Sequence, residues 1–181
     1  MTNPTYSNGS ETIMTFELDT KTKLRLLNVN PRRERHGDEN VPAVDLKLRL
    51  EASNDVLSMF DGHLKSALYF RNGVAPDQGG LDGVPDVSDM PNLRFPKLEP
   101  LRWDSEQIGC EFSIDHGLGG KSDLTLDGCA VNNFVIEPKE GGTVVVTFRV
   151  QCDSIHEREL GKLCTMIDSN IEATLSGPPD A

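Results

Sequence analysis

Apolar and polar residues alternate strictly over positions 44–51, and this run is the clearest element that the sequence predicts. Its apolar positions are Val44, Leu46, Leu48 and Leu50. Its polar positions are Asp45, Lys47, Arg49 and Glu51. A period of two residues predicts a strand, here 41–51, with one buried face and one solvated face.

A helix is predicted to follow this strand over residues 54–71. Ser53 and Asn54 offer side-chain oxygens as N-caps, and Asn72-Gly73 ends the helix with residues that tolerate the left-handed conformation. Its apolar residues recur at helical spacing, at Leu57, Phe60, Leu64, Ala67 and Leu68. A second helix is predicted after Ser154, because Glu157 stands at capping-box spacing from it. The apolar stripe of this helix is Leu160, Leu163, Cys164 and Ile167.

Shorter alternating runs predict the other strands. They cover residues 13–18, 23–29, 110–115, 123–129, 131–137, 144–150 and 171–175. Residues 30–40 contain turn formers and charged residues, and they predict a long exposed hairpin tip. Strands grouped in this way indicate an α+β fold, either a curved antiparallel sheet or a partly open, OB-like β-barrel, with two helices and a long loop.

The length of 181 residues predicts one α+β domain over residues 13–176. Residues 1–12 are polar and predict a disordered leader, and residues 177–181 predict a flexible tail. The stretch 72–100 is rich in Pro, Gly and Asp and predicts a long surface loop. Three apolar residues are expected to pin this loop across the sheet: Leu93, Phe95 and Leu98. No run approaches the roughly 18 apolar residues of a membrane helix, and the N-terminal residues do not resemble a signal peptide, so we expect a cytoplasmic protein.

The sequence predicts neither an enzyme nor a metal or cofactor site. The cysteines form no Cys-x-x-Cys pair, so buried, reduced thiols are expected at Cys110, Cys129, Cys152 and Cys164. Residues 115–122 end in Gly-Lys-Ser, but Asp115 stands where a phosphate-binding loop needs glycine, and the following residues alternate like a strand. A glycine-rich hairpin turn is therefore expected there. The four histidines are scattered, and no serine lies in a nucleophile elbow.

Charge is distributed unevenly along the chain, although the total is −11. Residues 21–49 carry eight basic and four acidic side chains, a net charge of +4. The other residues carry ten basic and 25 acidic side chains, a net charge of −15. Such asymmetry predicts a basic patch on an otherwise acidic protein. The alternative is a solvated hairpin face with ordinary cross-strand ion pairs.

Three turn segments resemble those of uncharacterised proteins encoded by tailed phages and prophages. They are Val-Pro-Ala-Val-Asp at 41–45, Asp-His-Gly-Leu-Gly-Gly at 115–120 and Pro-Lys-Glu-Gly-Gly at 138–142. The resemblance extends over nearly the whole chain from about Phe16. It implies a small protein made in an infected bacterial cell and encoded near genes of replication or recombination. It implies no particular activity, because the shared motifs are structural turns.

The function favoured by these observations is non-catalytic binding of single-stranded DNA or RNA in phage replication or recombination. The basic hairpin 21–49 would contact the phosphate backbone, and aromatic side chains for stacking are available at Tyr69, Phe70, Phe95 and Trp103. The predicted site residues are Lys21, Lys23, Arg25, Arg32, Arg33, Arg35, Lys47, Arg49 and Trp103.

Two other classes of function stay open. An acidic interaction protein would use the carboxylates of residues 72–100 to inhibit a host factor, such as a defence or DNA-processing enzyme. A structural or assembly protein would associate through the edge of its sheet. A homodimer is compatible with each class.

Overall fold

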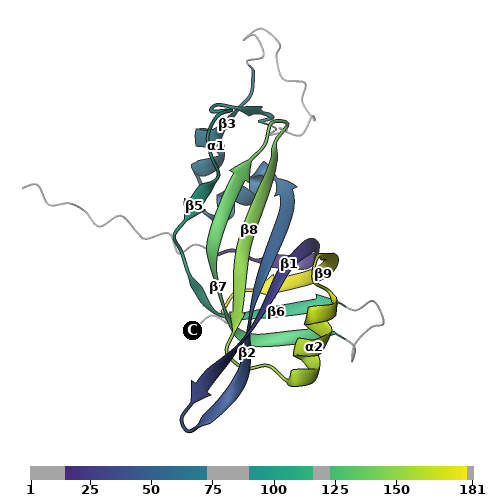
Figure 1. The fold of residues 1–181 in the computed structure, drawn as a ribbon. Helices are drawn as coiled ribbons and strands as arrows, with labels where there is room; N and C mark the ends of the chain where they lie inside the picture. The colour runs from purple at the N-terminus through teal and green to yellow at the C-terminus, as the bar shows by residue number, and fades with distance from the viewer. Residues whose placement is uncertain (1–14, 73–89, 116–122, 179–181) are drawn as a thin grey trace, which may run out of the picture.

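The computed structural model describes residues 15–72, 90–115 and 123–178 (Figure 1). Within these residues, six antiparallel strands form a closed barrel in the order β7-β6-β9-β1-β2-β8, and pairing of β8 with β7 closes it. The six strands are β1 (Leu18–His36), β2 (Glu39–Ser53), β6 (Gln107–Asp115), β7 (Leu124–Pro138), β8 (Thr143–Cys152) and β9 (Ser169–Ser176). A short strand, β5 (Leu101–Trp103), pairs with β7 outside this ring. The predicted antiparallel sheet with helices is confirmed, but the barrel is closed and not partly open.

The strand predicted at 41–51 is confirmed, with both of its faces. Leu46 and Leu48 are fully buried, whereas Lys47 between them is exposed. The barrel interior is filled by such inward-facing residues and by four phenylalanines that contact one another, with ring centroids 5.1–5.6 Å apart in the closest pairs. These rings belong to Phe16, Phe60, Phe134 and Phe148. One continuous core therefore joins all six strands.

The predicted loop at 30–40 is a continuation of two strands. β1 and β2 stay paired up to His36 opposite Glu39, so the turn consists of Gly37 and Asp38 alone. Gly37 has φ +63°, a conformation that glycine adopts without the strain a side chain would cause. The hairpin tip is exposed and projects below the barrel in Figure 1. The prediction of an exposed tip is confirmed, but the prediction of a long loop is wrong.

The helix predicted over 54–71 is wrong in length. The chain forms a 3₁₀ helix, η1 (Asn54–Met59), and a short α-helix, α1 (Leu64–Leu68), separated near Gly62. Asn54 explains the irregular start, because its N–H donates to the Gly142 carbonyl at 2.8 Å and its side-chain amide donates to the Met90 carbonyl at 2.9 Å. These tertiary hydrogen bonds replace the predicted cap. After α1, β3 (Tyr69–Phe70) pairs with β4 (Asn92–Leu93).

The second helix is present but starts later than predicted. α2 (Glu157–Thr165) is capped by His156, whose side chain and that of Glu159 form the capping box. The predicted cap, Ser154, lies before the helix, because the adjacent Ile155 is buried and donates its N–H to the Pro42 carbonyl at 2.9 Å. α2 contacts β1, and just after the helix the Asp168 N–H donates to the Leu26 carbonyl of β1 at 2.7 Å. Leu163 is the one residue of its predicted stripe that is fully buried.

Several other predictions can be compared with the structure only in part, because some of their residues lie outside the described ranges. The disordered leader, residues 73–89 of the long loop and the glycine-rich turn at 116–122 lie outside them. Of the three residues expected to pin the loop, Leu93 packs on the core, but Phe95 and Leu98 are 57% and 42% exposed. Gly177, the first residue of the predicted tail, donates its N–H to Glu17 at 2.9 Å.

Three of the four cysteines are buried as predicted, and Cys164 is exposed. The thiols of Cys129 and Cys152 share a hydrogen bond, which together with burial raises the pKa of Cys129. This thiol therefore stays protonated and unreactive at neutral pH. In the described part of the chain, no three His, Cys, Asp or Glu side chains are grouped in a way that would hold a metal ion. None of the helices described is long and apolar enough to cross a membrane.

Replacing Tyr69 with phenylalanine is expected to lower the free energy of unfolding by about 1–3 kcal/mol. The Tyr69 ring is fully buried, and its hydroxyl lies 2.8 and 2.9 Å from the carbonyls of Lys139 and Thr143 and accepts from the Lys139 N–H at 2.9 Å. Its loss removes these hydrogen bonds, which contribute about 0.5–1.5 kcal/mol each, although the Lys139 N–H and the Thr143 carbonyl keep their mutual bond at 2.8 Å. Urea denaturation followed by circular dichroism measures the change. A difference below about 0.3 kcal/mol would show that water replaces the hydroxyl there.

Candidate nucleic-acid interface

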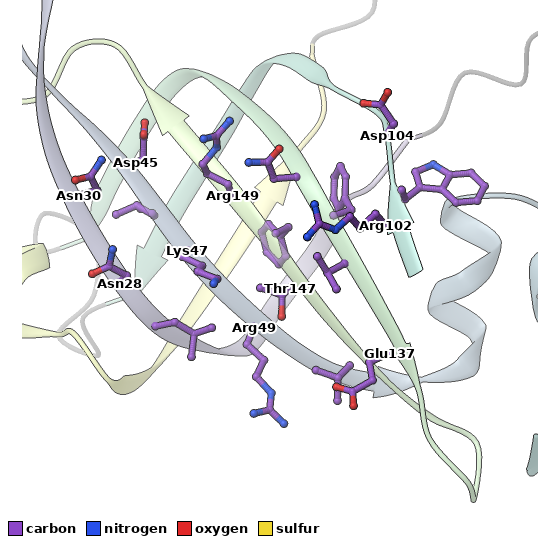
Figure 2. A pocket seen from close by; sticks show the side chains of 18 residues that line it. Asn28, Asn30, Asp45, Lys47, Arg49, Arg102, Asp104, Glu137, Thr147 and Arg149 are labelled. Atoms are coloured by element: carbon purple, nitrogen blue, oxygen red, sulfur yellow. The ribbon is translucent and has the colours of Figure 1, made fainter. Parts of the chain in front are cut away.

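A groove of about 850 Å³ runs over the outer face of β1, β2, β8, β7 and β5. Four cationic side chains line it, and Figure 2 shows them together: Lys47, Arg49, Arg102 and Arg149. Lys47 and Arg49 come from β2, Arg149 comes from β8 and Arg102 comes from β5. Trp103 also lines the groove, beside Arg102.

The alternation of the strands explains why these side chains face outward. Lys47 and Arg49 occupy the positions between the buried Leu46, Leu48 and Leu50, so the same pattern that builds the core points them away from it. In β8, Arg149 lies between the buried Phe148 and Val150. The groove therefore lies on the outer side of strands whose inner faces form part of the core.

Strand register aligns the cations across the sheet. Lys47 lies opposite Arg149, and Arg49 lies opposite Thr147. Thr147 lies opposite Val135 of β7, and Val135 lies opposite Arg102 of β5. Neighbouring strands are about 4.8 Å apart, so the three steps from β2 to β5 span about 14 Å. The charges form a band that crosses the strands.

Three of these cations form no ion pair within the described chain, although the carboxylates of Asp45, Asp104 and Glu137 also line the groove and the charge of Arg149 acts on Asp45. Among the described residues, Lys47, Arg102 and Arg149 form no ion pair, whereas Arg49 contacts Glu51 at 2.9 Å. Nε of Arg149 donates to Oδ1 of Asn132 at 2.9 Å, which orients the guanidinium without cancelling its charge. Nε of Arg49 is enclosed by protein and has no hydrogen-bond partner in the described part of the chain. The groove thus presents cations that form no ion pair with any described residue.

One end of the groove is closed by an acidic network around Arg32. This side chain contacts Asp45 at 2.7 Å and Asp153 at 2.7 Å, and it also pairs with Glu34. Burial of Asp45 alone would raise its pKa, but hydrogen bonds from Arg32 and Gln151 and the charge of Arg32 outweigh burial and hold this pKa below its ordinary value. Asp45 is therefore ionised at neutral pH, and Arg32 is fully engaged.

The structure brings together only some of the residues predicted from the sequence. Lys47, Arg49 and Trp103 all line the groove. Arg25 lies opposite Arg49 but contacts Asp168 at 2.6 Å. Lys21 pairs with Asp115, and Lys23 lies opposite Glu172, both at the β9 side of β1 and away from the groove lining.

The arginines of the hairpin tip do not extend the groove. Arg32 and Arg33 are adjacent in β1, so they point to opposite faces of the hairpin, and Arg35 shares the face of Arg33. Arg32 is neutralised as described, and Arg35 lies near Asp38 and donates to the Gly37 carbonyl at 3.1 Å. The expected single patch along the hairpin is therefore divided.

The aromatic residues considered for stacking also differ in their placement. Tyr69 is fully buried, so it is unavailable to a ligand. Phe70 lies under the Arg94 guanidinium, 5.5 Å from it, and Phe95 is exposed but is not part of the groove lining. Trp103 is half-buried and packs edge-to-face on Phe60, with ring centroids 5.9 Å apart. It is the aromatic residue that the groove combines with cations.

Sequence reasoning missed Arg102 and Arg149. Arg149 stands at an outward position of the alternating run 144–150, and Arg102 stands between two apolar residues, so both could be predicted to face solvent. Their proximity to Lys47 follows from strand pairing, which no local pattern encodes. Comparison with known protein families, with curated proteins and with solved structures finds no match to this chain, so its function is inferred from the groove itself.

Proposed function

We propose that this protein binds single-stranded nucleic acid in the groove and performs no catalysis. The observation that carries the proposal is the band of Lys47, Arg149 and Arg102, three cations that form no ion pair within the described chain, next to Trp103. Proteins that bind single strands combine a positive groove, which follows the phosphates, with aromatic rings on which bases stack. Antiparallel barrels of the OB type carry such sites on their outer face.

The acidic remainder of the protein supports the same proposal. With a total charge of −11, most of the surface repels a polyanion, and this repulsion is weakest in the groove because of its cations. The strand would cross β2, β8, β7 and β5, not follow the hairpin to its tip. A role in phage replication or recombination fits this activity, and it rests on the resemblance of the turn segments to phage proteins. The alternative of an acidic inhibitor depends on residues 72–100, most of which lie outside the described chain.

Fluorescence polarisation with labelled oligo-dT and with a duplex, each at several salt concentrations, tests the proposal. Four phosphate contacts give a slope of log affinity against log salt near −3, at about 0.7 for each phosphate of a single strand. The duplex is expected to bind more weakly, because its bases cannot stack on Trp103. Replacing Lys47, Arg102 and Arg149 with alanine should weaken oligo-dT binding at least about tenfold and flatten the slope by about 2.

A matched control separates groove contacts from net charge. Replacing Lys23, Arg33 and Arg158 with alanine removes the same three charges from exposed positions outside the groove lining. This variant should keep most of the affinity and of the slope. Equal losses in the two triple variants, or no binding of the unmodified protein to oligo-dT at low salt, would contradict the proposal.

Replacing Asp45 with asparagine should tighten binding up to about fivefold. Asp45 lines the groove as a carboxylate, and its removal also releases one of the three acids that hold Arg32. A gain of this size corresponds to about 1 kcal/mol, the upper value for one charge pair near a surface. The same polarisation assay measures it; unchanged affinity of the variant would show that the strand avoids this end of the groove, and weaker binding would contradict the prediction.

A further inference from the structure

Two β-bulges flank the groove, one on each side of the β2–β8 pair. In β1, the register with β2 shifts between Leu26 and Asn28. In β7, the register with β8 shifts between Asn132 and Val135. A bulge adds one residue to a strand and redirects its side chain, and bulges are frequent beside functional sites.

Each bulge places an additional asparagine on the outer face. In β1, Leu26 and Val29 point into the core, so the strand carries two successive outward residues, of which Asn28 is exposed. In β7, Val131 and Phe134 point into the core, and Asn133 is exposed between them. Both asparagines line the groove. The bulges therefore bring an amide to each of its flanks.

The two amides are available to a ligand. Neither Asn28 nor Asn133 has a side-chain hydrogen bond within the described residues. The neighbouring Asn132 differs, because its amide is used by Glu106 and Gln151, at 3.0 and 2.8 Å, and by Arg149. Asn133 also has φ +55°, a strained conformation for a residue with a side chain. Such strain is common at functional sites and motivates a functional hypothesis.

The amides and the cations form one row across four strands. Asn28 lies opposite Lys47, Lys47 lies opposite Arg149, and Arg149 lies opposite Asn132, the residue before Asn133. A ligand with its phosphate on the two central cations would therefore place neutral polar groups at both ends of the row. In single-stranded nucleic acid, these groups are the edges of unpaired bases.

We infer that Asn28 and Asn133 read base edges and that the groove prefers adenine; this inference rests on the proposed binding of single-stranded nucleic acid. A carboxamide carries a donor and an acceptor side by side. Adenine offers the complementary pair: its N6 amino group donates to the carboxamide oxygen of asparagine, and its N7 accepts from the carboxamide N–H. On the edge that carries N7 in adenine, thymine presents only the O4 acceptor and a methyl group, and its donor N3–H lies on the Watson–Crick edge. Phosphate contacts alone would give no such preference.

Polarisation titrations with oligo-dA, oligo-dT and oligo-7-deaza-dA of equal length test the inference. The unmodified protein is expected to bind oligo-dA at least about fivefold more tightly than oligo-dT, the lower value for one bidentate contact. The 7-deaza oligomer lacks the N7 acceptor, so its affinity should fall toward that of oligo-dT. This arm uses the unmodified protein and does not depend on how a variant folds.

Two substitutions then test whether the asparagines at the bulges cause the preference for oligo-dA over oligo-dT. Asn28→Ala removes one amide, and Asn133→Gly removes the other with a residue that adopts positive φ freely. The double variant should bind oligo-dA and oligo-dT with a ratio near 1, while the salt slope stays unchanged because no phosphate contact is lost. Asn40→Ala, at the exposed hairpin tip, is the matched control and should keep the ratio.

The outcomes separate the inference from the proposed function. Equal affinity of the unmodified protein for oligo-dA and oligo-dT overturns base reading and leaves the proposed function intact. A preference that survives in the double variant, or in the 7-deaza oligomer, overturns the roles of the two asparagines. Absence of binding to every oligomer at low salt overturns the inference together with the proposed function.

Discussion

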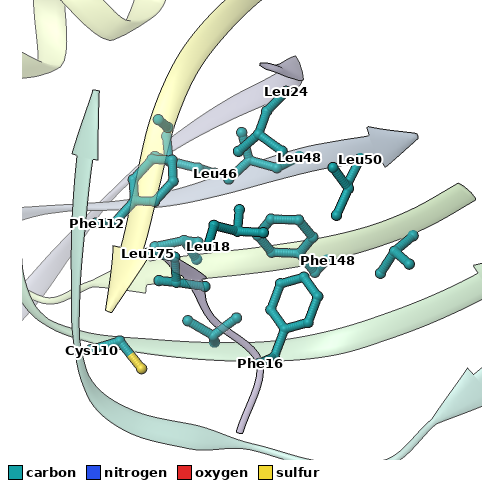
Figure 3. Packing of buried hydrophobic residues seen from close by; sticks show 14 of the residues in the cluster. Phe16, Leu18, Leu24, Leu46, Leu48, Leu50, Cys110, Phe112, Phe148 and Leu175 are labelled. Atoms are coloured by element: carbon teal, nitrogen blue, oxygen red, sulfur yellow. The ribbon is translucent and has the colours of Figure 1, made fainter. Parts of the chain in front are cut away.

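Replacing Leu48 with alanine is expected to lower the free energy of unfolding by about 2–5 kcal/mol. Leu48 is fully buried in the barrel, opposite Leu26 of β1 and Phe148 of β8, and Figure 3 shows it among the residues of the core. Truncation removes apolar contacts and leaves a cavity, because strands that are paired on both sides cannot move inward to fill it. Urea denaturation followed by the fluorescence of Trp103, the one tryptophan of the chain, measures the effect.

Lys47→Ala supplies the control for this substitution. Lys47 is the next residue of the same strand and faces outward, so its truncation should change the free energy of unfolding by less than about 0.5 kcal/mol. If the two variants were equally stable, Leu48 would not occupy the tightly packed interior described above. Together, the two measurements test whether adjacent residues of β2 alternate between the buried and the exposed face of the strand.

A chain that ends at Asp168, and so lacks β9, is expected to lose the native fold. β9 lies between β1 and β6 and is paired with both. It contributes three buried residues to the core, Ile171, Ala173 and Leu175. Its removal would expose this apolar surface and the backbone groups of two strand edges. The combined cost exceeds the roughly 5–15 kcal/mol that stabilises an ordinary domain.

Circular dichroism and amide-proton NMR would show this loss as absent thermal cooperativity and collapsed chemical-shift dispersion. A chain that ends at Pro178 is the control, because it keeps β9 and the hydrogen bond from Gly177 to Glu17. It should melt as the full-length protein does. A cooperative transition in the shorter chain would mean that β1 and β6 can close the barrel directly.

The faces of individual strands were predictable because each depends on local alternation alone. The run 44–51 and the run 144–150 both place their apolar residues inward, as expected from a period of two residues. Helix limits were less predictable, because tertiary hydrogen bonds override local caps. The carbonyl of Gly142 engages Asn54, and the carbonyl of Pro42 engages Ile155, and both acceptors lie far away in the sequence.

The candidate site was predictable to a similar extent. Outward cations such as Lys47 and Arg49 follow from alternation, and so does the opposite orientation of Arg32 and Arg33, although the sequence analysis grouped these two arginines. The contribution of Arg149 depends on the register between β2 and β8. The two bulges could not be predicted from the sequence either, because a bulge is defined relative to the partner strand.

The position of β9 also has a consequence for synthesis of the protein. Among the described barrel strands β9 is synthesised after all the others, and its pairing with β1 joins Leu24 to Ile171, which lie far apart in the sequence. Until β9 has been synthesised, β1 and β6 therefore lack the neighbour that β9 provides, and their edges can pair with other chains. Long-range pairing of this kind also slows folding after release. Newly made protein should consequently depend on chaperones more than its size suggests.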